Sequence, residues 1–289
     1  MIAITGATGH LGQATIQALL RTVPASEIIA VVRDPHKAAS LQAQGVQIRR
    51  GDYNDPASLT EAFAGADKVL LISTSEVEYE LRVRQHRHVI AAAQQAGVAH
   101  LAYTSVVNPS PDSPFPASPG HYATEADVRS SGLTYTIFRN TLYFDILPAL
   151  VGDSAVAGGS LYANAGAGRV SYALRSELGE ATANALLSPA SANQVYDLAP
   201  APAHSMADIA AALSQVSGRP VQYVPVQATE LAAVMREHQL PEIMIGVLVG
   251  MMQAMEQGEF DLGSPALEQL LGRKPTTLQQ FVAGVYAGN

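Results

Sequence analysis

The chain has 289 residues, of which 48% are hydrophobic and 15% are charged, and its formal net charge is −8 at pH 7. This negative charge argues against a protein that binds nucleic-acid backbones, since such proteins carry basic patches. The apolar content argues against overall disorder. No cysteine is present, which excludes disulfides, thiolate nucleophiles and cysteine-ligated metals.

The chain starts with a predicted strand over Ile2–Thr5, without the basic and apolar regions of a signal peptide. The longest apolar run, Ile243–Met252, contains two glycines and is too short to span a bilayer. We therefore expect a cytoplasmic protein that does not associate with membranes.

Short β-branched runs alternate with helical patterns in the first half of the chain. The expected strands are Ile2–Thr5, Ile28–Val32, Val46–Arg49, Val69–Ser73, Leu101–Ser105 and Tyr135–Phe138. They are almost entirely apolar, which is typical of strands covered on both faces. Apolar residues recur at helical spacing from Ile16 to Val23, and Asp55-Pro56 indicates an N-cap followed by proline at the first helical position. The alternation predicts an α/β fold with a doubly wound parallel sheet.

The second half of the chain has a less regular pattern. Five prolines in residues 108–120 predict an irregular loop. Further on we expect strands at Val195–Leu198 and Val221–Val224, and helices near 176–187, 206–217, 229–238, 243–257 and 277–285. We predict that residues 1–140, completed by parts of 170–200, form a dinucleotide-binding domain. Residues 141–289 would form mostly a smaller, mainly helical substrate cap at the carboxyl edge of the sheet.

A glycine motif joins the first strand to the first helix, with the sequence Gly6-Ala7-Thr8-Gly9-His10-Leu11-Gly12. Gly6 would permit a tight turn, Gly9 would let the backbone approach a diphosphate, and Gly12 would allow close packing of helix on strand. The free N–H groups and the helix dipole favour an anion at this point. A glycine-rich turn without a ligand is the alternative, but the position between an apolar strand and an amphipathic helix favours a dinucleotide.

Arg33 ends the second strand, 21 residues after Gly12. A carboxylate at this point would accept hydrogen bonds from the adenosine ribose of NAD, whereas a guanidinium suits a 2′-phosphate. Lys37 adds positive charge nearby, while Asp34 leaves a ribose contact open, and a solvated Arg–Asp turn is a further alternative. We predict NADP(H) rather than NAD(H).

Two further groups follow predicted strands at the same edge of the sheet. Asp52-Tyr53 follows the third strand, where a side chain can border the adenine, and Ser73-Thr74-Ser75 ends the fourth, where hydroxyls can reach phosphates or ribose. Turn chemistry at a strand end explains either group equally well.

The chain resembles the NmrA-like branch of the atypical short-chain dehydrogenases/reductases, in particular its bacterial members that reduce quinones or triphenylmethane dyes. The segments that carry the resemblance are MIAITGATGHLG, VPASEIIAVVRDPHKA, RRGDYNDPASL, KVLLISTSEV, QHRHVIAAAQQAGV, HLAYTS and YTIFRN. The resemblance implies an extended Rossmann fold that holds NADPH through residues 6–11, Arg33, Ser73–Ser75 and the segment 140–145, including Asn140 and Tyr143. The substrate would lie in the cleft under the cap.

The usual catalytic pair of short-chain dehydrogenases, Tyr-x-x-x-Lys, is missing. The comparable stretch is His121–Ala126, and the chain's three lysines, Lys37, Lys68 and Lys274, lie far from it in sequence. Reduction of ordinary ketones therefore lacks its proton relay. A quinone or a cationic dye accepts hydride readily and needs mainly positioning.

Several side chains near the expected cleft have two interpretations each. His121 could protonate the quinol oxygen, or it could line the cleft or cap the helix after the proline-rich loop. Tyr143 and Phe144 could offer aromatic surface to the substrate, or could be core residues. Five methionines gather in the cap, at positions 235, 244, 251, 252 and 255. We interpret them as core rather than as pocket lining.

Other clusters of charged or metal-ligating residues carry no function in our interpretation. His86 and His88 are two apart on a predicted helix, about 200° around it, so they do not face one metal, and we predict no metal site. Arg82, Arg84 and Arg87 are interpreted as a solvated helix face rather than a nucleic-acid patch.

We therefore expect an NADPH-dependent reductase that transfers hydride to quinones or related aromatic acceptors. The alternatives are an NmrA-type redox sensor that binds dinucleotide without catalysis, and a reductase whose main substrates are triarylmethane dyes. The expected partner is a small aromatic acceptor, with no nucleic acid and no membrane, and a homodimer is kept as one possible assembly.

Overall fold

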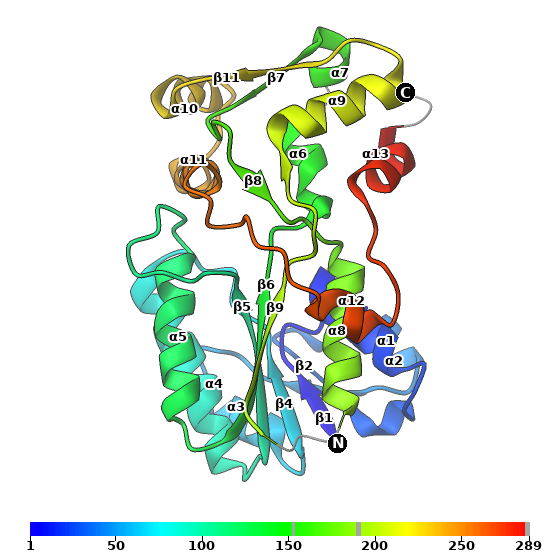
Figure 1. The fold of residues 1–289 in the computed structure, drawn as a ribbon. Helices are drawn as coiled ribbons and strands as arrows, with labels where there is room; N and C mark the ends of the chain where they lie inside the picture. Colours follow the sequence, from blue (N-terminus) through cyan, green and yellow to red (C-terminus); the bar gives the residue numbers. More distant parts are fainter. Residues whose placement is uncertain (152–153, 189–191, 287–289) are drawn as a thin grey trace.

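The computed structural model describes residues 1–151, 154–188 and 192–286, and its centre is a seven-stranded sheet (Figure 1). All neighbouring strands in this sheet are parallel. Their order is β3 (Gln47–Arg50), β2 (Ile28–Val32), β1 (Ile2–Ile4), β4 (Lys68–Leu71), β5 (His100–Val106), β6 (Thr134–Asn140) and β9 (Gln194–Leu198). The predicted doubly wound parallel sheet is confirmed, and each predicted strand of the first half overlaps an observed one.

Helices cover both faces of the sheet (Figure 1). One face packs against α1 (His10–Leu19), α2 (Ala39–Ala43), α8 (Arg175–Leu187) and α12 (Ala266–Leu271). The other face packs against α3 (Pro56–Phe63), α4 (Tyr79–Gln95) and α5 (Ser118–Ser130). Short 3₁₀ turns, η1 (Ala25–Glu27) and η2 (Pro35–Ala38), flank β2. The predicted N-cap is confirmed, because the Asp55 side chain accepts from the Ser58 N–H and Pro56 opens α3.

A buried carboxylate joins α5 to the sheet. Glu125, whose side chain is 6% exposed, accepts from Nε and Nη2 of Arg139 on β6, at 2.8 and 2.7 Å, and from Arg129 at 3.1 Å. Burial has the largest single effect and raises the pKa of Glu125, but the hydrogen bonds from Arg139, Ser105 and Arg129 and the charge of Arg139 together outweigh it and hold that pKa below its ordinary 4.5. The pair therefore stabilises the fold only while Glu125 is ionised.

Replacing Glu125 with glutamine is expected to lower the free energy of unfolding at pH 7 by about 2 kcal/mol, because a partly buried Arg139 loses its bidentate partner. Since the folded-state pKa is depressed, the difference from the wild type is complete above pH 4.5 and disappears as pH falls through the folded pKa. Urea unfolding at several pH values measures this. Glu242→Gln, in the exposed pair with Arg236, is the control and should change little; an equal loss in both variants would contradict the argument.

The remaining elements surround one further hydrophobic core, which we call the cap (Figure 1). Its helices are η3 (Phe144–Ile146), α6 (Leu147–Val151), α7 (Ser154–Gly158), α9 (Met206–Ser217), α10 (Ala228–Glu237), α11 (Glu242–Glu256) and α13 (Leu278–Tyr286). Two small sheets pair β7 (Ser160–Ala163) with β11 (Gln222–Pro225), and β8 (Arg169–Val170) with β10 (His204–Ser205). Within the described residues, no helix is both long and apolar enough to cross a membrane.

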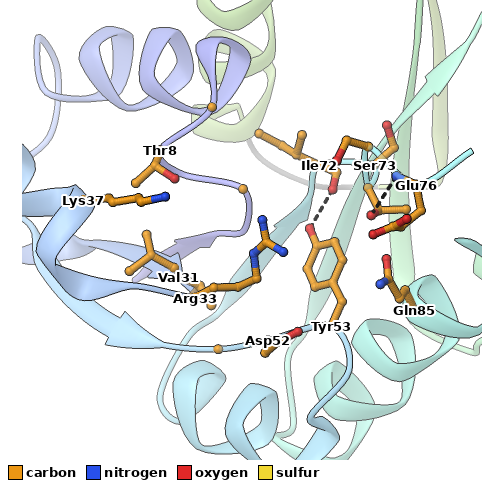
Figure 2. Close-up of a pocket in the computed structure, with 16 residues that line it drawn as sticks. Thr8, Val31, Arg33, Lys37, Asp52, Tyr53, Ile72, Ser73, Glu76 and Gln85 are labelled. Carbon is orange, nitrogen blue, oxygen red and sulfur yellow. Dashed lines mark hydrogen bonds between the residues drawn. The ribbon is translucent and has the colours of Figure 1, made fainter. Parts of the chain in front are cut away.

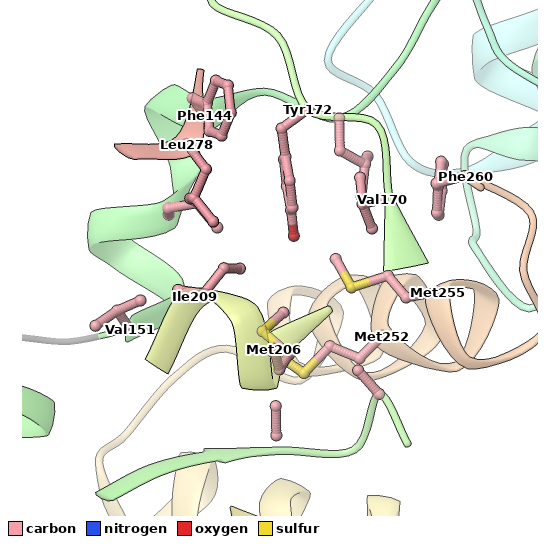
Figure 3. Packing of buried hydrophobic residues seen from close by; sticks show 14 of the residues in the cluster. Phe144, Val151, Val170, Tyr172, Met206, Ile209, Met252, Met255, Phe260 and Leu278 are labelled. Atoms are coloured by element: carbon pink, nitrogen blue, oxygen red, sulfur yellow. The ribbon is translucent and has the colours of Figure 1, made fainter. Parts of the chain in front are cut away.

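Methionine and aromatic side chains fill the cap core (Figure 3). Met251, Met252 and Met255 are buried there, which agrees with their interpretation as core residues. Met244, in contrast, is 45% exposed. The predicted cap helices all occur within two residues of their expected bounds.

The proline-rich loop is shorter than predicted and is attached to the cap. It ends at Ala117, because α5 begins at Ser118. Asn108 donates to the Glu259 carbonyl at 2.8 Å, Ser113 donates to the Glu259 carboxylate at 2.6 Å, and the ring centres of Phe115 and Phe260 are 6.0 Å apart. The loop therefore bridges the large sheet and the cap.

Candidate functional site

A cavity of about 500 Å³ opens at the carboxyl ends of β1, β2, β3 and β4 (Figure 2). From β1 the strand order proceeds through β2 to β3 toward one edge of the sheet, and β4 then lies next to β1 in the direction of the other edge. Such a change of direction is where doubly wound sheets bind ligands. The lining residues are Gly6, Thr8, Gly9, Val31, Val32, Arg33, Lys37, Gly51, Asp52, Tyr53, Ile72, Ser73, Thr74, Ser75, Glu76 and Gln85.

The glycine turn forms one end of this cavity. Gly6 has a φ of +58°, and its carbonyl accepts from the Gly9 N–H at 2.9 Å. Gly9 is the N-cap of α1 and provides no side chain to the first-turn N–H groups, which leaves them available to an anion. A Cβ on Gly12 would lie 2.4 Å from the Gly6 carbonyl oxygen, so only glycine fits beneath the turn.

The motif residues divide into lining and supporting positions. Gly6, Thr8 and Gly9 line the cavity. Ala7, Leu11 and Gly12 are buried and do not line it, whereas His10 is exposed and does not line it.

Two cations lie on the side of the cavity formed by β2 and η2. Arg33 at the end of β2 and Lys37 in η2 are exposed, and both line the cavity (Figure 2). Neither forms an ion pair within the described part of the chain. The carboxylate of Asp34 accepts from the His36 N–H at 3.0 Å and does not line the cavity. This arrangement favours a phosphate next to Arg33 over a ribose held by Asp34.

Asp52 and Tyr53 form the floor between β3 and β4 (Figure 2). The Tyr53 hydroxyl lies 2.5 Å from Thr5 Oγ1 and donates to the Ile72 carbonyl at 2.6 Å. Burial raises the pKa of Tyr53, so its hydroxyl stays protonated and serves as a hydrogen-bond donor. Ser73, Thr74 and Ser75 line the opposite wall, as predicted.

Asn140 presents a buried amide at the end of β6. It is 2% exposed, and within the described residues neither its Oδ1 nor its Nδ2 meets the geometry of a hydrogen bond; its remaining polar interaction is with the Tyr143 side chain. Buried polar groups are nearly always paired, and a bare amide suggests that a ligand completes the site. Tyr143 is half-buried, with the Arg175 guanidinium 4.6 Å from its ring centre. Neither Asn140 nor Tyr143 lines the 500 Å³ cavity itself.

Phe144 does not offer surface to a substrate, which corrects the prediction. It is 1% exposed and lies in the cap core near Tyr172 (Figure 3). Its ring stacks on those of Tyr172 and Phe281, with ring centres 5.4 and 5.1 Å away. Burial of this large apolar ring stabilises the fold more than its exposure in a cleft would.

The surroundings of His121 contradict its expected role as a proton donor. It is 6% exposed, its Nε2 accepts from Arg82 at 2.9 Å, and its Nδ1 lies 2.7 Å from the Tyr103 hydroxyl. Burial, followed by the positive charge of Arg82, holds the pKa of His121 well below 6.5. The ring is therefore neutral at physiological pH, and it does not line the cavity.

Arg82 also differs from the prediction. Arg84 and Arg87 are exposed on α4, but Arg82 is only 4% exposed and points into the protein. Its burial was not predicted, because an arginine on a helix is usually solvated. Within the described residues, no group of three or more His, Asp or Glu could hold a metal ion.

Comparisons with known proteins agree over the whole chain. The sequence model of the NmrA-like family matches residues 1–282. The chain is 39% identical over 290 residues to quinone oxidoreductase 2 of Escherichia coli, covering 100% of both, and 30% identical to an NAD(P)H azoreductase of Xenophilus azovorans, covering 84% of this chain and 82% of that protein.

Solved structures show the same similarity. An NADPH complex of the E. coli NADPH-dependent quinone oxidoreductase has a TM-score of 0.94 at 38% identity, covering 99% of this chain and 100% of that one. The Citrobacter triphenylmethane reductase with NADP(H) has a TM-score of 0.93 at 38% identity, covering 98% and 99%. The transcriptional regulator NmrA, at 20% identity and a TM-score of 0.79, shares the fold.

Proposed function

The chain belongs to the NmrA-like family, and on that premise we propose that it is an NADPH-dependent reductase that transfers hydride to quinones or related aromatic acceptors. The observation that carries the proposal is the cavity at the glycine turn, lined by Arg33 and Lys37, which form no ion pair within the described residues. Two similar proteins were solved with NADPH or NADP(H), in line with the cofactor predicted from Arg33.

The residues of the cavity fit this cofactor. The first-turn N–H groups of α1 would hold the diphosphate, and Arg33 and Lys37 would bind the 2′-phosphate. Ser73–Ser75 would contact the side of NADPH that faces β4. The bare amide of Asn140 would pair with the nicotinamide end or with the acceptor. When bound, NADPH supplies the hydride.

The choice of acceptor follows from the missing proton relay. Lys68 donates to the carbonyls of Leu186 and Ser188, far from the carboxyl edge of the sheet, and neither Lys37 nor Lys274 lies near the buried His121 or Tyr103 in sequence. A site without a proton relay suits acceptors for which hydride transfer needs mainly correct orientation and the exclusion of water. Quinones and cationic dyes are of this kind.

Replacing Asn140 with leucine is expected to leave the free energy of unfolding of the ligand-free protein unchanged or raised by about 1 kcal/mol, because within the described residues no hydrogen bond of good geometry is lost, only the interaction with Tyr143. In contrast, the rise in Tm that NADPH produces should fall by at least about half. Asn184→Leu is the control, because the Asn184 amide donates to the Leu270 carbonyl at 2.8 Å. This variant should be less stable than the wild type and should show the same rise in Tm with NADPH. A lower ligand-free Tm with an unchanged rise in the Asn140 variant would contradict the proposed role.

Absorbance at 340 nm, followed with NADPH and a benzoquinone or a triarylmethane dye, tests the proposed activity directly. Enzyme-dependent oxidation above the spontaneous rate is expected, and the ratio of kcat/KM values for quinone and dye identifies the main acceptor. Tight NADPH binding without turnover on any such acceptor would favour the non-catalytic redox sensor. The division of the chain into a cofactor domain and a substrate cap, the homodimer and the cytoplasmic location stay predictions.

A further inference from the structure

One wall of the cavity consists of Ile72–Glu76, which follows β4 and is neither helix nor strand. We call this segment the wall. Backbone groups outside regular structure need other partners, and here side chains supply them. Ile72 N–H donates to Thr5 Oγ1 at 3.0 Å, its carbonyl accepts from Tyr53, and Ser73 N–H donates to Thr104 Oγ1 at 2.9 Å.

Helix α4 holds the second half of the wall. The Thr74 N–H donates to Nε2 of His86 at 3.0 Å, and Nη1 of Arg82 donates to the carbonyls of Thr74, at 2.9 Å, and Glu76. His86 is fully buried and Arg82 is 4% exposed. The shape of the wall therefore depends on two buried side chains that do not line the cavity.

His121 fixes the position of Arg82 from the far side. A guanidinium can only donate hydrogen bonds, so Nε2 of His121 accepts at 2.9 Å and Nδ1 carries the proton toward Tyr103. Within the described residues Arg82 forms no ion pair; its partners are two carbonyls and this imidazole. Removing an acceptor from a buried charge is costly, because the donor that remains cannot return to water.

We propose that Arg82 and His121 are positioning residues of the cofactor site: His121 orients the guanidinium, and the guanidinium fixes the carbonyls of the wall against which NADPH binds. This inference rests on the proposed function. It also gives His121 a role that its buried position allows.

The test compares three variants by direct titration with NADPH and by steady-state kinetics. His121→Leu removes the acceptor and is expected to raise the Kd and the KM for NADPH by about tenfold or more, with kcat at saturating NADPH changed less than about twofold. His121→Gln keeps an amide oxygen that can accept from Arg82, and should restore most of the affinity. His100→Leu is the matched control: His100 is also buried, and its Nε2 lies 3.0 Å from Thr136 Oγ1, but it stands at the first residue of β5, at the end of the sheet away from the cavity. It should lose stability and keep the NADPH Kd.

Three results would overturn the inference. One is a folded His121→Leu protein that binds NADPH as tightly as the wild type, and the second is a His121→Gln protein as weak as His121→Leu. The third result concerns Arg82→Lys, which is used if His121→Leu does not fold. Lysine keeps the charge but cannot reach both carbonyls and His121. An NADPH Kd equal to that of the wild type in this variant would overturn the inference. A wild-type protein that binds no NADPH would instead refute the proposed function.

Discussion

Replacing Gly12 with alanine is expected to raise the Kd for NADPH by about hundredfold or more, equivalent to roughly 3 kcal/mol. The added Cβ would lie 2.4 Å from the Gly6 carbonyl oxygen and 2.9 Å from the Ala7 Cα. Both are backbone atoms of the turn, so no side-chain rotation can relieve the clash. The turn must move away from α1, which displaces the N–H groups that face the diphosphate, and the free energy of unfolding should fall by about 1 to 3 kcal/mol. Calorimetric titration with NADPH and urea unfolding measure the two effects.

Gly284→Ala is the control for this substitution. Gly284 lies in α13 and a Cβ there would meet no heavy atom within 4 Å. Alanine should therefore stabilise the helix by about 0.5 to 1 kcal/mol and leave the NADPH Kd unchanged. A Gly12→Ala protein that binds NADPH like the wild type would show that the turn is not part of the cofactor site.

Replacing Arg33 with alanine is expected to remove the preference for NADPH over NADH. Charge-assisted hydrogen bonds from a guanidinium to the 2′-phosphate are worth about 1.5 to 3 kcal/mol, so the NADPH Kd should rise about 10- to 150-fold. NADH has no 2′-phosphate, and its Kd should change less than about threefold. The ratio of the two Kd values is the measurement.

Arg50→Ala serves as the matched control for Arg33. Arg50 ends the neighbouring strand β3 and pairs with Asp55 at 3.1 Å, but it does not line the cavity. Its removal lowers the local positive charge equally and should leave the ratio of the two Kd values unchanged, since exposed charges at a distance are screened. Equal losses of NADPH and NADH affinity in Arg33→Ala would contradict the assignment of the 2′-phosphate to Arg33.

The large sheet was predictable because its strands are covered on both faces. The run Ile28–Val32 is buried throughout, and such continuous apolar runs leave few alternatives to a central parallel strand. The cap strands β7, β8 and β10 were missed, since each has only two to four residues. Their partners lie far along the chain, as for Ser160 and Gln222, so no local pattern marks them.

The cavity was predictable where its residues belong to strand-to-helix turns. The lining residues predicted in this way are Gly6, Thr8 and Gly9 of the glycine motif, Arg33, Asp52, Tyr53 and Ser73–Ser75. They meet because parallel strands bring their carboxyl ends to one edge.

Arg82 could not be placed in the same way. Whether its charge faces water or the interior depends on the carbonyls of Thr74 and Glu76, which only the tertiary fold brings to it. The sequence left two interpretations open for His121 and for Phe144 for the same reason, since the surroundings of both depend on neighbours from other elements.

The elements that complete the cofactor-binding half are synthesised late. Leu178, Ala181 and Leu186 of α8 share a core with Leu11 and Ile16 of α1, and β9 covers the outer edge of β6. A nascent chain that has emerged from the ribosome only as far as Asn140 carries the whole glycine motif, yet the side of α1 that packs against α8 and the outer edge of β6 are still uncovered. Such a chain offers other molecules a surface for aggregation. Truncated or stalled products of this protein should therefore aggregate more readily than the full chain.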